Sequence, residues 1–187
     1  MRVISGTARR TLLSAPKGQN TRPTADRVKE NAFNIIATQL HGAIVLDLFC
    51  GSGAIGIEAL SRGAAHAVFV DTSVDAVNVT EENLQHVRFT DRAQVLNMCA
   101  LKAIDRLKKK GMKFDIIYLD PPYGVGLLDE AMQALALSDL LAPDGMIIAE
   151  YDKDEPPPSH TSFHMLDQRK YGNTRVSFYW HLEGKAQ

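Results

Sequence analysis

The chain has 187 residues, of which 45% are hydrophobic and 23% are charged. This length and composition are typical of one globular domain. The two cysteines, Cys50 and Cys99, exclude a disulfide framework and favour a reducing compartment. No apolar run approaches membrane-spanning length, and the first residues lack the apolar core of a signal peptide. We therefore expect a cytoplasmic protein without membrane attachment.

The net charge of −1 conceals an asymmetry along the chain. Residues 1–29 contain seven basic residues and one acidic residue, whereas the remainder contains 14 basic and 21 acidic residues. A basic segment on an acidic body indicates either a polyanionic partner or a solvated surface segment. Charge alone does not decide between them.

The chain begins with short β-capable pieces separated by glycine and proline. Residues 1–20 predict a small hairpin or extended arm outside the core. We expect a single domain with a basic N-terminal arm over residues 1–23 and a catalytic Rossmann-like body over residues 24–187. A helix should start the body, with Thr24 as its N-cap and its end near residues 41–42. Residues 43–49 are almost continuously apolar, which is the pattern of a central parallel strand.

Strands and helices then alternate. Apolar runs and helical periodicity predict strands over 67–71, 94–98, 114–119 and 146–151, and helices over 57–62, 74–86, 101–110 and 127–141. Two strand-like segments at the end, 163–166 and 175–180, predict an antiparallel pair. The fold class is therefore α/β: a Rossmann-like, doubly wound and mostly parallel sheet, with a terminal antiparallel edge pair and an N-terminal β-arm.

A glycine pattern, Gly51-x-Gly53-x-x-Gly56, lies between a predicted strand and a predicted helix. Glycines in this context let backbone amides approach a ligand at the helix N-terminus. Asp71 ends the next strand, where its carboxylate can accept hydrogen bonds from both hydroxyls of a ribose. These features by themselves fit NAD and S-adenosylmethionine equally well.

The segment Asp120-Pro121-Pro122-Tyr123 directly follows the strand predicted over 114–119. The two prolines cannot extend the strand, because neither has a backbone N–H and each fixes its own φ. The chain therefore leaves the sheet stiffly at a carboxyl end, where open α/β sheets bind ligands. Asp120 and the Pro121 carbonyl can accept hydrogen bonds from a planar amino group, and the Tyr123 ring can stack on a flat substrate. The corner predicts methyl transfer to an exocyclic amine or carboxamide; the alternative is a rigid loop with a capping Asp.

Three features favour S-adenosylmethionine over NAD. Asp47 lies four residues before the first glycine, where a carboxylate suits an ammonium group and would repel a pyrophosphate. The proline corner has a chemical use in methyl transfer, and the chain lacks the second domain that most dehydrogenases use for their substrate. Asp47 has an alternative role as a strand-end residue that caps the next turn.

The segments 21–28, 45–53, 57–64, 119–123 and 170–174 together resemble the class I methyltransferases. More narrowly, they resemble the bacterial 16S ribosomal RNA guanine-N2 methyltransferase family, over almost the whole chain. The resemblance implies an S-adenosylmethionine-dependent enzyme that methylates the exocyclic N2 of a guanine in 16S ribosomal RNA, with small-subunit particles as its partner. For Glu58 it favours a buried polar contact to the N-terminal arm over the role of an ordinary first-turn acid.

The resemblance also implies residue roles. The catalytic residues would be Asp120, Pro121, Pro122 and Tyr123. The cofactor-binding residues would be Asp47, Phe49, Cys50, Gly51, Gly53, Asp71, Thr72, Cys99 and Ala100. The RNA-binding residues would be Arg9, Arg10, Arg22 and Thr24. Cys99 departs from the family, which usually has an acid for the adenine amino group at this position, so adenine would depend on a backbone group or on Asn97. We expect both thiols to serve in packing.

Two other functions remain open. A DNA adenine-N6 methyltransferase uses a similar proline corner, although a separate target-recognition domain does not fit in 187 residues. A non-catalytic RNA-binding or assembly factor could keep the same fold. No metal site is predicted, because the histidines show no ligand spacing beyond His160 and His164, which we expect at the surface. A monomer is expected.

Overall fold

The structure is a computed structural model and describes residues 1–16 and 23–181. Its centre is a seven-stranded sheet in the order β3-β2-β1-β4-β5-β7-β6. The strands are β1 Ile44–Asp47, β2 His66–Asp71, β3 Ala93–Asn97, β4 Phe114–Leu119, β5 Leu141–Asp152, β6 Phe163–Tyr171 and β7 Thr174–His181. Strands β1 to β5 pair in parallel, and β7 pairs antiparallel with both β5 and β6. The predicted α/β fold with an antiparallel edge pair is confirmed.

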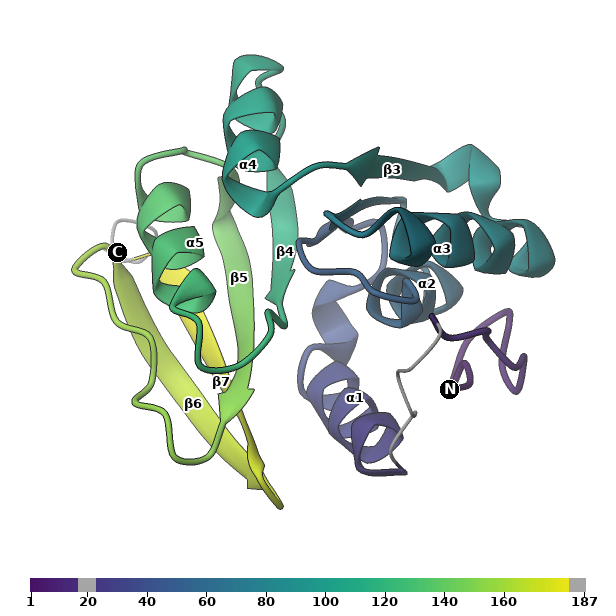
Figure 1. The fold of residues 1–187 in the computed structure, drawn as a ribbon, viewed down its shortest axis with the longest axis horizontal. Coiled ribbons are helices and arrows are strands. Elements are labelled where there is room, and N and C mark those ends of the chain that lie inside the picture. The colour runs from purple at the N-terminus through teal and green to yellow at the C-terminus, as the bar shows by residue number, and fades with distance from the viewer. Residues whose placement is uncertain (17–22, 182–187) are drawn as a thin grey trace.

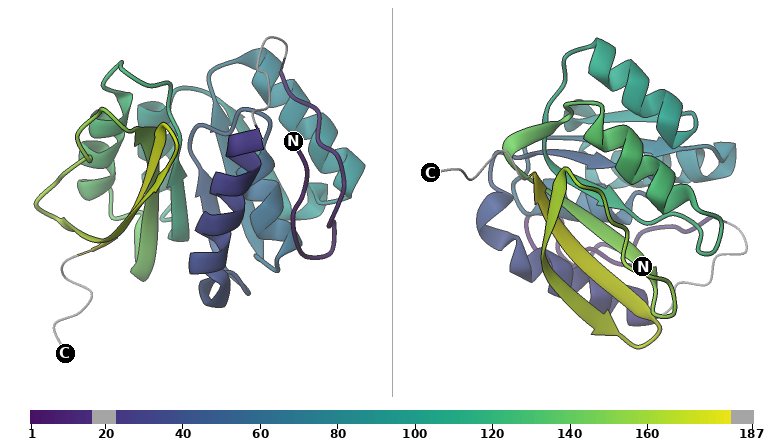
Figure 2. Two further views of the ribbon diagram at one scale, coloured as in Figure 1. Left: turned by 90° about the horizontal axis from the view of Figure 1, so that it is seen from below. Right: turned by 90° about the vertical axis from the view of Figure 1, so that its left-hand side faces the viewer.

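Helices cover both faces of the sheet (Figure 1). They are α1 Pro23–Ile35, α2 Ala54–Ser61, α3 Val74–Val87, α4 Ala100–Lys109 and α5 Leu127–Ala136, with 3-10 turns at Ala37–Gln39 and Thr90–Arg92. The right-hand view of Figure 2 places α4 and α5 on one side of the sheet and α1 on the other. The described helices are too short or too polar to cross a membrane.

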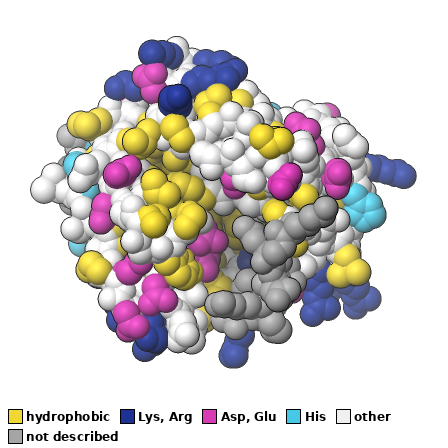
Figure 3. All heavy atoms as spheres, in the orientation of Figure 1, with side chains coloured by type: hydrophobic (Ala, Val, Ile, Leu, Met, Phe, Trp, Pro, Cys, Tyr) yellow, Lys and Arg dark blue, Asp and Glu magenta, His cyan; other side chains and the backbone are white. Residues whose placement is uncertain are grey.

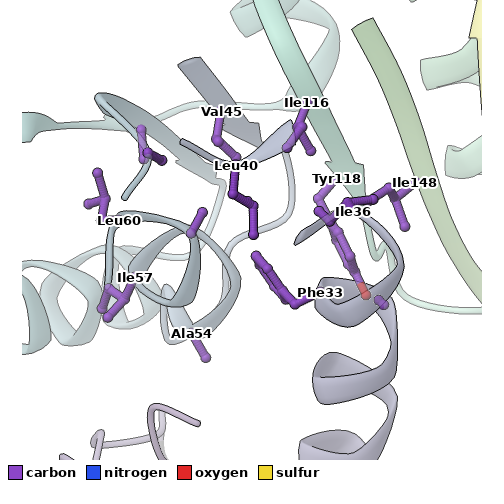
Figure 4. Close-up of a cluster of buried hydrophobic side chains, with 14 of the residues drawn as sticks. Phe33, Ile36, Leu40, Val45, Ala54, Ile57, Leu60, Ile116, Tyr118 and Ile148 are labelled. Carbon is purple, nitrogen blue, oxygen red and sulfur yellow. The ribbon is translucent and has the colours of Figure 1, made fainter. Parts of the chain in front are cut away.

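Two hydrophobic clusters fill the space between the sheet and these helices. In the first cluster, Phe33 of α1 and Ile36, which directly follows α1, lie against Tyr118 and Ile148 of the sheet (Figure 4). The second cluster joins α4 and α5 to alternate residues of the same strands. Because β1, β2 and β4 are buried on both faces, their sequences are almost continuously apolar, which is the signal that predicted them.

The N-terminal residues form a hairpin that packs on α2. An isolated bridge joins Arg2 to Leu12, and the Val3 amide donates to the Thr11 carbonyl over 2.9 Å. Val3 and Leu13 are nevertheless buried members of the first cluster, so the prediction that this segment lies outside the core is wrong. The sequence shows only short β-capable pieces, and it does not show that their apolar side chains cover α2.

Both boundaries of α1 differ from the prediction. Helix α1 begins at Pro23, so Thr24 lies inside the helix and not at its N-cap; proline suits the first helical position because its φ is already helical. The same helix ends at Ile35, and a 3-10 turn continues the chain toward residue 41.

At α5 the predicted helix is too long. The helix ends at Ala136, and Leu141 instead begins β5 by pairing with Phe114 across an irregularity in the register. The Phe114 amide donates to the Leu140 carbonyl over 2.8 Å, so pairing with β4 overrides the local helical periodicity there.

Candidate active site

A cavity of about 950 Å³ lies at the carboxyl ends of the central parallel strands. Cavities of this size bind cofactors and drug-sized ligands. The predicted cofactor residues that line it are Phe49, Cys50, Gly51, Asp71, Thr72, Cys99 and Ala100, and the predicted catalytic residues that line it are Asp120, Pro121, Pro122 and Tyr123. The fold therefore brings together residues that are more than 70 positions apart in the sequence.

Asp47 and Gly53 do not line this cavity. The Asp47 side chain is 1% exposed beneath the glycine turn, and its Oδ2 accepts the Gly56 amide over 3.1 Å. Burial raises the pKa of the Asp47 carboxyl to about 7, against the Gly56 hydrogen bond, which lowers it. Gly53 has a φ of +74°, and an added Cβ there would lie 2.8 Å from Cγ2 of Thr80. Gly53 therefore serves the turn and its packing on Thr80.

Asp71 fixes the glycine turn from the end of β2. Its Oδ2 accepts the Gly51 amide and its Oδ1 accepts the Ser73 amide, both over 2.9 Å. The Ser73 hydroxyl in turn accepts the Ala76 amide and caps α3. A carboxylate has about four acceptor sites, so Asp71 keeps capacity for ligand hydroxyls in the cavity.

The thiols occupy two different environments. Cys50 is buried, its Sγ lies 3.7 Å from the Thr80 hydroxyl, and burial raises the pKa of the thiol, which fits the packing role. Cys99 is only half-buried and faces the cavity, so its expected packing role is not what the structure shows. The Asn97 amide donates to the carbonyls of Asp71 and Thr72, both over 3.1 Å, and ties β3 to the end of β2. Asn97 does not line the cavity.

The proline corner carries its acidic and aromatic side chains into the cavity. The Asp120 side chain is open to the cavity. The surrounding protein raises the pKa of Asp120, mainly by desolvating its carboxyl and to a smaller extent through the nearby Glu150 and Asp47 carboxyls. Water reaches Asp120 through the opening, so this desolvation acts in full only when a ligand fills the cavity. The loop is held by the Gly124 amide, which donates to Oε1 of Glu155 over 2.5 Å.

The sequence motifs did not indicate three charged residues that line the cavity, Lys29, Glu130 and Glu150. Lys29 is 2% exposed; its Nζ donates to the Arg2 carbonyl over 2.7 Å and lies 3.4 Å from Oε2 of Glu58. Burial lowers the pKa of Lys29. Glu150 had a signal in the sequence, because it is the acid in the apolar run predicted as strand 146–151.

Glu58 makes a buried contact to the N-terminal hairpin, which is the role that the family resemblance favoured. It is fully buried, and its two oxygens accept the amides of Ile4 and Ser5 over 2.8 and 3.0 Å. Arg62 donates to the same carboxylate over 2.7 Å. This ionic cluster fixes the hairpin beside the cavity, whose wall includes Met1.

The structure describes Arg9, Arg10 and Thr24, three of the four predicted RNA-binding residues. Arg9 and Arg10 are exposed on the hairpin. Arg22 lies outside the described residues, and Thr24 lies in α1. Within residues 1–16 and 23–181, no cluster of three or more His, Cys, Asp or Glu side chains suits a metal ion.

Comparisons with known proteins agree with this architecture. A family model described as "Conserved hypothetical protein 95" matches residues 1–180. The Bacillus subtilis (strain 168) protein named "Putative rRNA methyltransferase YlbH" is 41% identical over 180 residues, covering 96% of this chain and 98% of that protein. The Haemophilus influenzae protein named "Ribosomal RNA small subunit methyltransferase D" is 32% identical, covering 96% of this chain and 93% of that protein.

A solved structure from Escherichia coli, described as "Putative methyltransferase yhhF", superimposes with a TM-score of 0.85 at 31% identity and covers 97% of both chains. The resemblance stated from the sequence motifs is therefore confirmed at the level of the family. The chain belongs to the family described as Conserved hypothetical protein 95, together with relatives named as small-subunit ribosomal RNA methyltransferases.

Proposed function

We propose that this protein transfers a methyl group from S-adenosylmethionine to the exocyclic N2 of a guanine in 16S ribosomal RNA of the small subunit. The observation that carries the proposal is the position of the Asp120–Tyr123 corner, whose four residues line the same cavity as Gly51 and Asp71. The names of the relatives support ribosomal RNA as the substrate class.

The cavity residues fit the proposed cofactor. Asp71 offers carboxylate oxygens for ribose hydroxyls, and Leu48, Phe49 and Met98 offer an apolar wall for a planar base. Asp47 lies below the turn. Its carboxylate would attract an ammonium group that binds in the cavity, on the other side of the Gly51–Gly53 backbone. S-adenosylmethionine supplies an electrophilic methyl group bound to a sulfonium.

Asp120 is the residue of the protein that contributes most directly to the transfer step. Its carboxylate and the Pro121 carbonyl accept the two N–H bonds of the amine, which frees the nitrogen lone pair from the aromatic ring. The new bond joins N2 to the methyl carbon, while the sulfur–carbon bond breaks with its electron pair left on sulfur. One N2 proton leaves to Asp120 or to water. Tyr123 holds the base by stacking.

The target guanine must leave its stack to reach the cavity, which favours a loop or an assembling subunit over a paired duplex. The test supplies labelled S-adenosylmethionine with unmethylated small-subunit particles, free 16S ribosomal RNA and DNA in separate reactions. Digestion of the product should give N2-methylguanosine from a ribosomal sample. N6-methyladenine from DNA would replace this function by the alternative, and cofactor binding without transfer to any sample would favour a non-catalytic factor.

A further inference from the structure

The cavity wall contains a second carboxylate beside the proline corner, Glu150. Strands β4 and β5 run in parallel, and Leu119 is in register with Ala149. Asp120, which directly follows β4, and Glu150, which lies near the carboxyl end of β5, are therefore neighbours on adjacent strands, whose backbones are about 4.8 Å apart. Neighbouring carboxyls disfavour each other's ionisation, and Glu150 is among the groups that raise the pKa of Asp120.

Glu150 also connects a rigid tyrosine to an exposed one. The Tyr118 hydroxyl donates to Oε2 of Glu150 over 2.9 Å, and the Tyr123 hydroxyl lies 3.4 Å from Oε1. Tyr118 is 1% exposed in the first hydrophobic cluster, so it fixes one side of the carboxylate. Tyr123 is 41% exposed, and its hydroxyl is shared with Thr174 of β7 at 3.5 Å.

We propose that Glu150 is a positioning residue for methyl transfer: it orients the Tyr123 ring at the cavity and keeps a second negative charge beside Asp120. The inference rests on the proposed function for its kinetic consequences. The Tyr123 side chain has two rotatable torsions and an exposed ring. A hydrogen bond from its hydroxyl to a fixed acceptor therefore restricts the orientation of the ring. A misplaced stacking ring lowers turnover because the reacting atoms lose alignment.

Glu150 changes the pKa of Asp120 in a known direction, which is upward. The titratable groups around this pair are Tyr118 from β4, Tyr123 from the corner and Asp47 from β1. The same cavity is also lined by Asp71, Glu130, Lys29, Cys50 and Cys99. A smaller cavity beside the corner is lined by Glu150 together with Asp129 and Glu155. After burial, the Glu150 carboxylate is the largest contribution that raises the pKa of Asp120. Burial also raises the pKa of Glu150, whereas the hydrogen bonds from Tyr118 and Tyr123 lower it and favour its charged form. Neutralising Glu150 should lower the pKa of Asp120, so the acceptor stays ionised, and the enzyme stays active, at lower pH.

The main test compares Glu150→Gln with wild type and with Glu81→Gln, which removes one negative charge from the exposed face of α3. We expect Glu150→Gln to bind the cofactor with unchanged affinity, to lose about tenfold to a hundredfold in kcat, and to move the acid limb of its pH profile downward. The Glu81→Gln control should match wild type. A kcat and pH profile equal to wild type would overturn the proposal, and so would a lower kcat with an unmoved acid limb, because a purely structural residue predicts that result.

A second variant isolates the contact to the ring. Tyr123→Phe keeps the ring and removes the hydroxyl that contacts Glu150, so its effect on kcat should not add to that of Glu150→Gln in the double variant. Independent, additive losses would contradict a role through Tyr123. Since the phenylalanine retains the ring and its half-exposed position, this variant also serves if Glu150→Gln folds poorly.

A readout without RNA separates this inference from the proposed function. Carboxyl carbon NMR of the free protein should give a lower titration midpoint for Asp120 in Glu150→Gln than in wild type. Equal midpoints would overturn the proposal whatever the activity assays give. A wild-type protein that methylates no ribosomal sample would instead contradict the proposed function, while the NMR comparison still decides the coupling of the two acids.

Discussion

Asp120 is the residue on which the proposed chemistry depends most directly. Asp120→Asn keeps the shape of the side chain but replaces an ionised acceptor by a neutral amide, so turnover should fall by about a hundredfold or more. Cofactor affinity, measured by equilibrium dialysis, should remain, because Asp71 and the glycine turn are unchanged. Asp144→Asn, at an exposed position in β5, is the matched control. Wild-type turnover in Asp120→Asn would remove the mechanism.

Asp47 shows how a buried acid at the site affects stability. Its pKa is raised from 3.8 to about 7, so the folded state binds a proton more tightly than the unfolded state. The sign follows directly: the free energy of unfolding should fall as pH rises from 4 to 7, by at most about 1.4 kcal/mol per pH unit. Asp47→Asn should flatten this dependence in urea unfolding and weaken cofactor binding. Parallel stability curves for the two proteins would contradict the raised pKa.

At the scale of elements, Glu58 joins α1, α2 and the N-terminal hairpin. Glu58→Gln would leave Lys29 buried without a full counter-charge, and breaking a buried pair costs about 3–5 kcal/mol. Asp105→Asn is the matched control, since Asp105 and Lys109 form an i,i+4 pair like Glu58 and Arg62, but on the exposed surface of α4. That control should cost less than about 1 kcal/mol. Equal losses in urea unfolding would show that burial does not decide the contribution of Glu58.

At the scale of the whole molecule, the charge asymmetry predicts where RNA binds. Lys29 is committed to Glu58, so the exposed hairpin residue Arg9 is the better test of the basic segment. Arg10 is less suitable because its φ of +72° would mix backbone effects into the result. If Arg9 contacts a phosphate, Arg9→Gln should reduce the slope of log K against log salt by about 0.7–0.9.

The control for this experiment lies at another basic surface. Lys and Arg side chains gather at the top of Figure 3, over the end of α4, whose last turn and C-cap contain Arg106, Lys108, Lys109 and Lys110. The first residues of α4 line the cavity, so this end lies about 15 Å along the helix from it. Lys110→Gln should leave the salt slope unchanged. If the salt slope is also unchanged in Arg9→Gln, the basic residues of the hairpin do not bind RNA and are an ordinary solvated surface.

The sequence by itself determined the order and type of the central elements. Strands buried on both faces are almost wholly apolar, so β1, β2 and β4 were predictable. The less buried β3 and the terminal pair were predictable from their strand-like residues and from the turns that bound them. The same local signals located the glycine turn, Asp71 and the Asp120 corner, because each lies at or just after the end of a predicted strand. Parallel strands place such ends at one edge, and the cavity is found there.

Only the tertiary structure decided the features that depend on partners distant in the chain. Pairing with Phe114 turned Leu141 from a helix end into a strand, and packing on α2 brought Val3 and Leu13 into the core. The contact between Glu150 and Tyr123 spans 27 positions and depends on the register of β5 beside β4. Local propensity carries no information about such contacts, since they arise when separate elements bury their surfaces against each other.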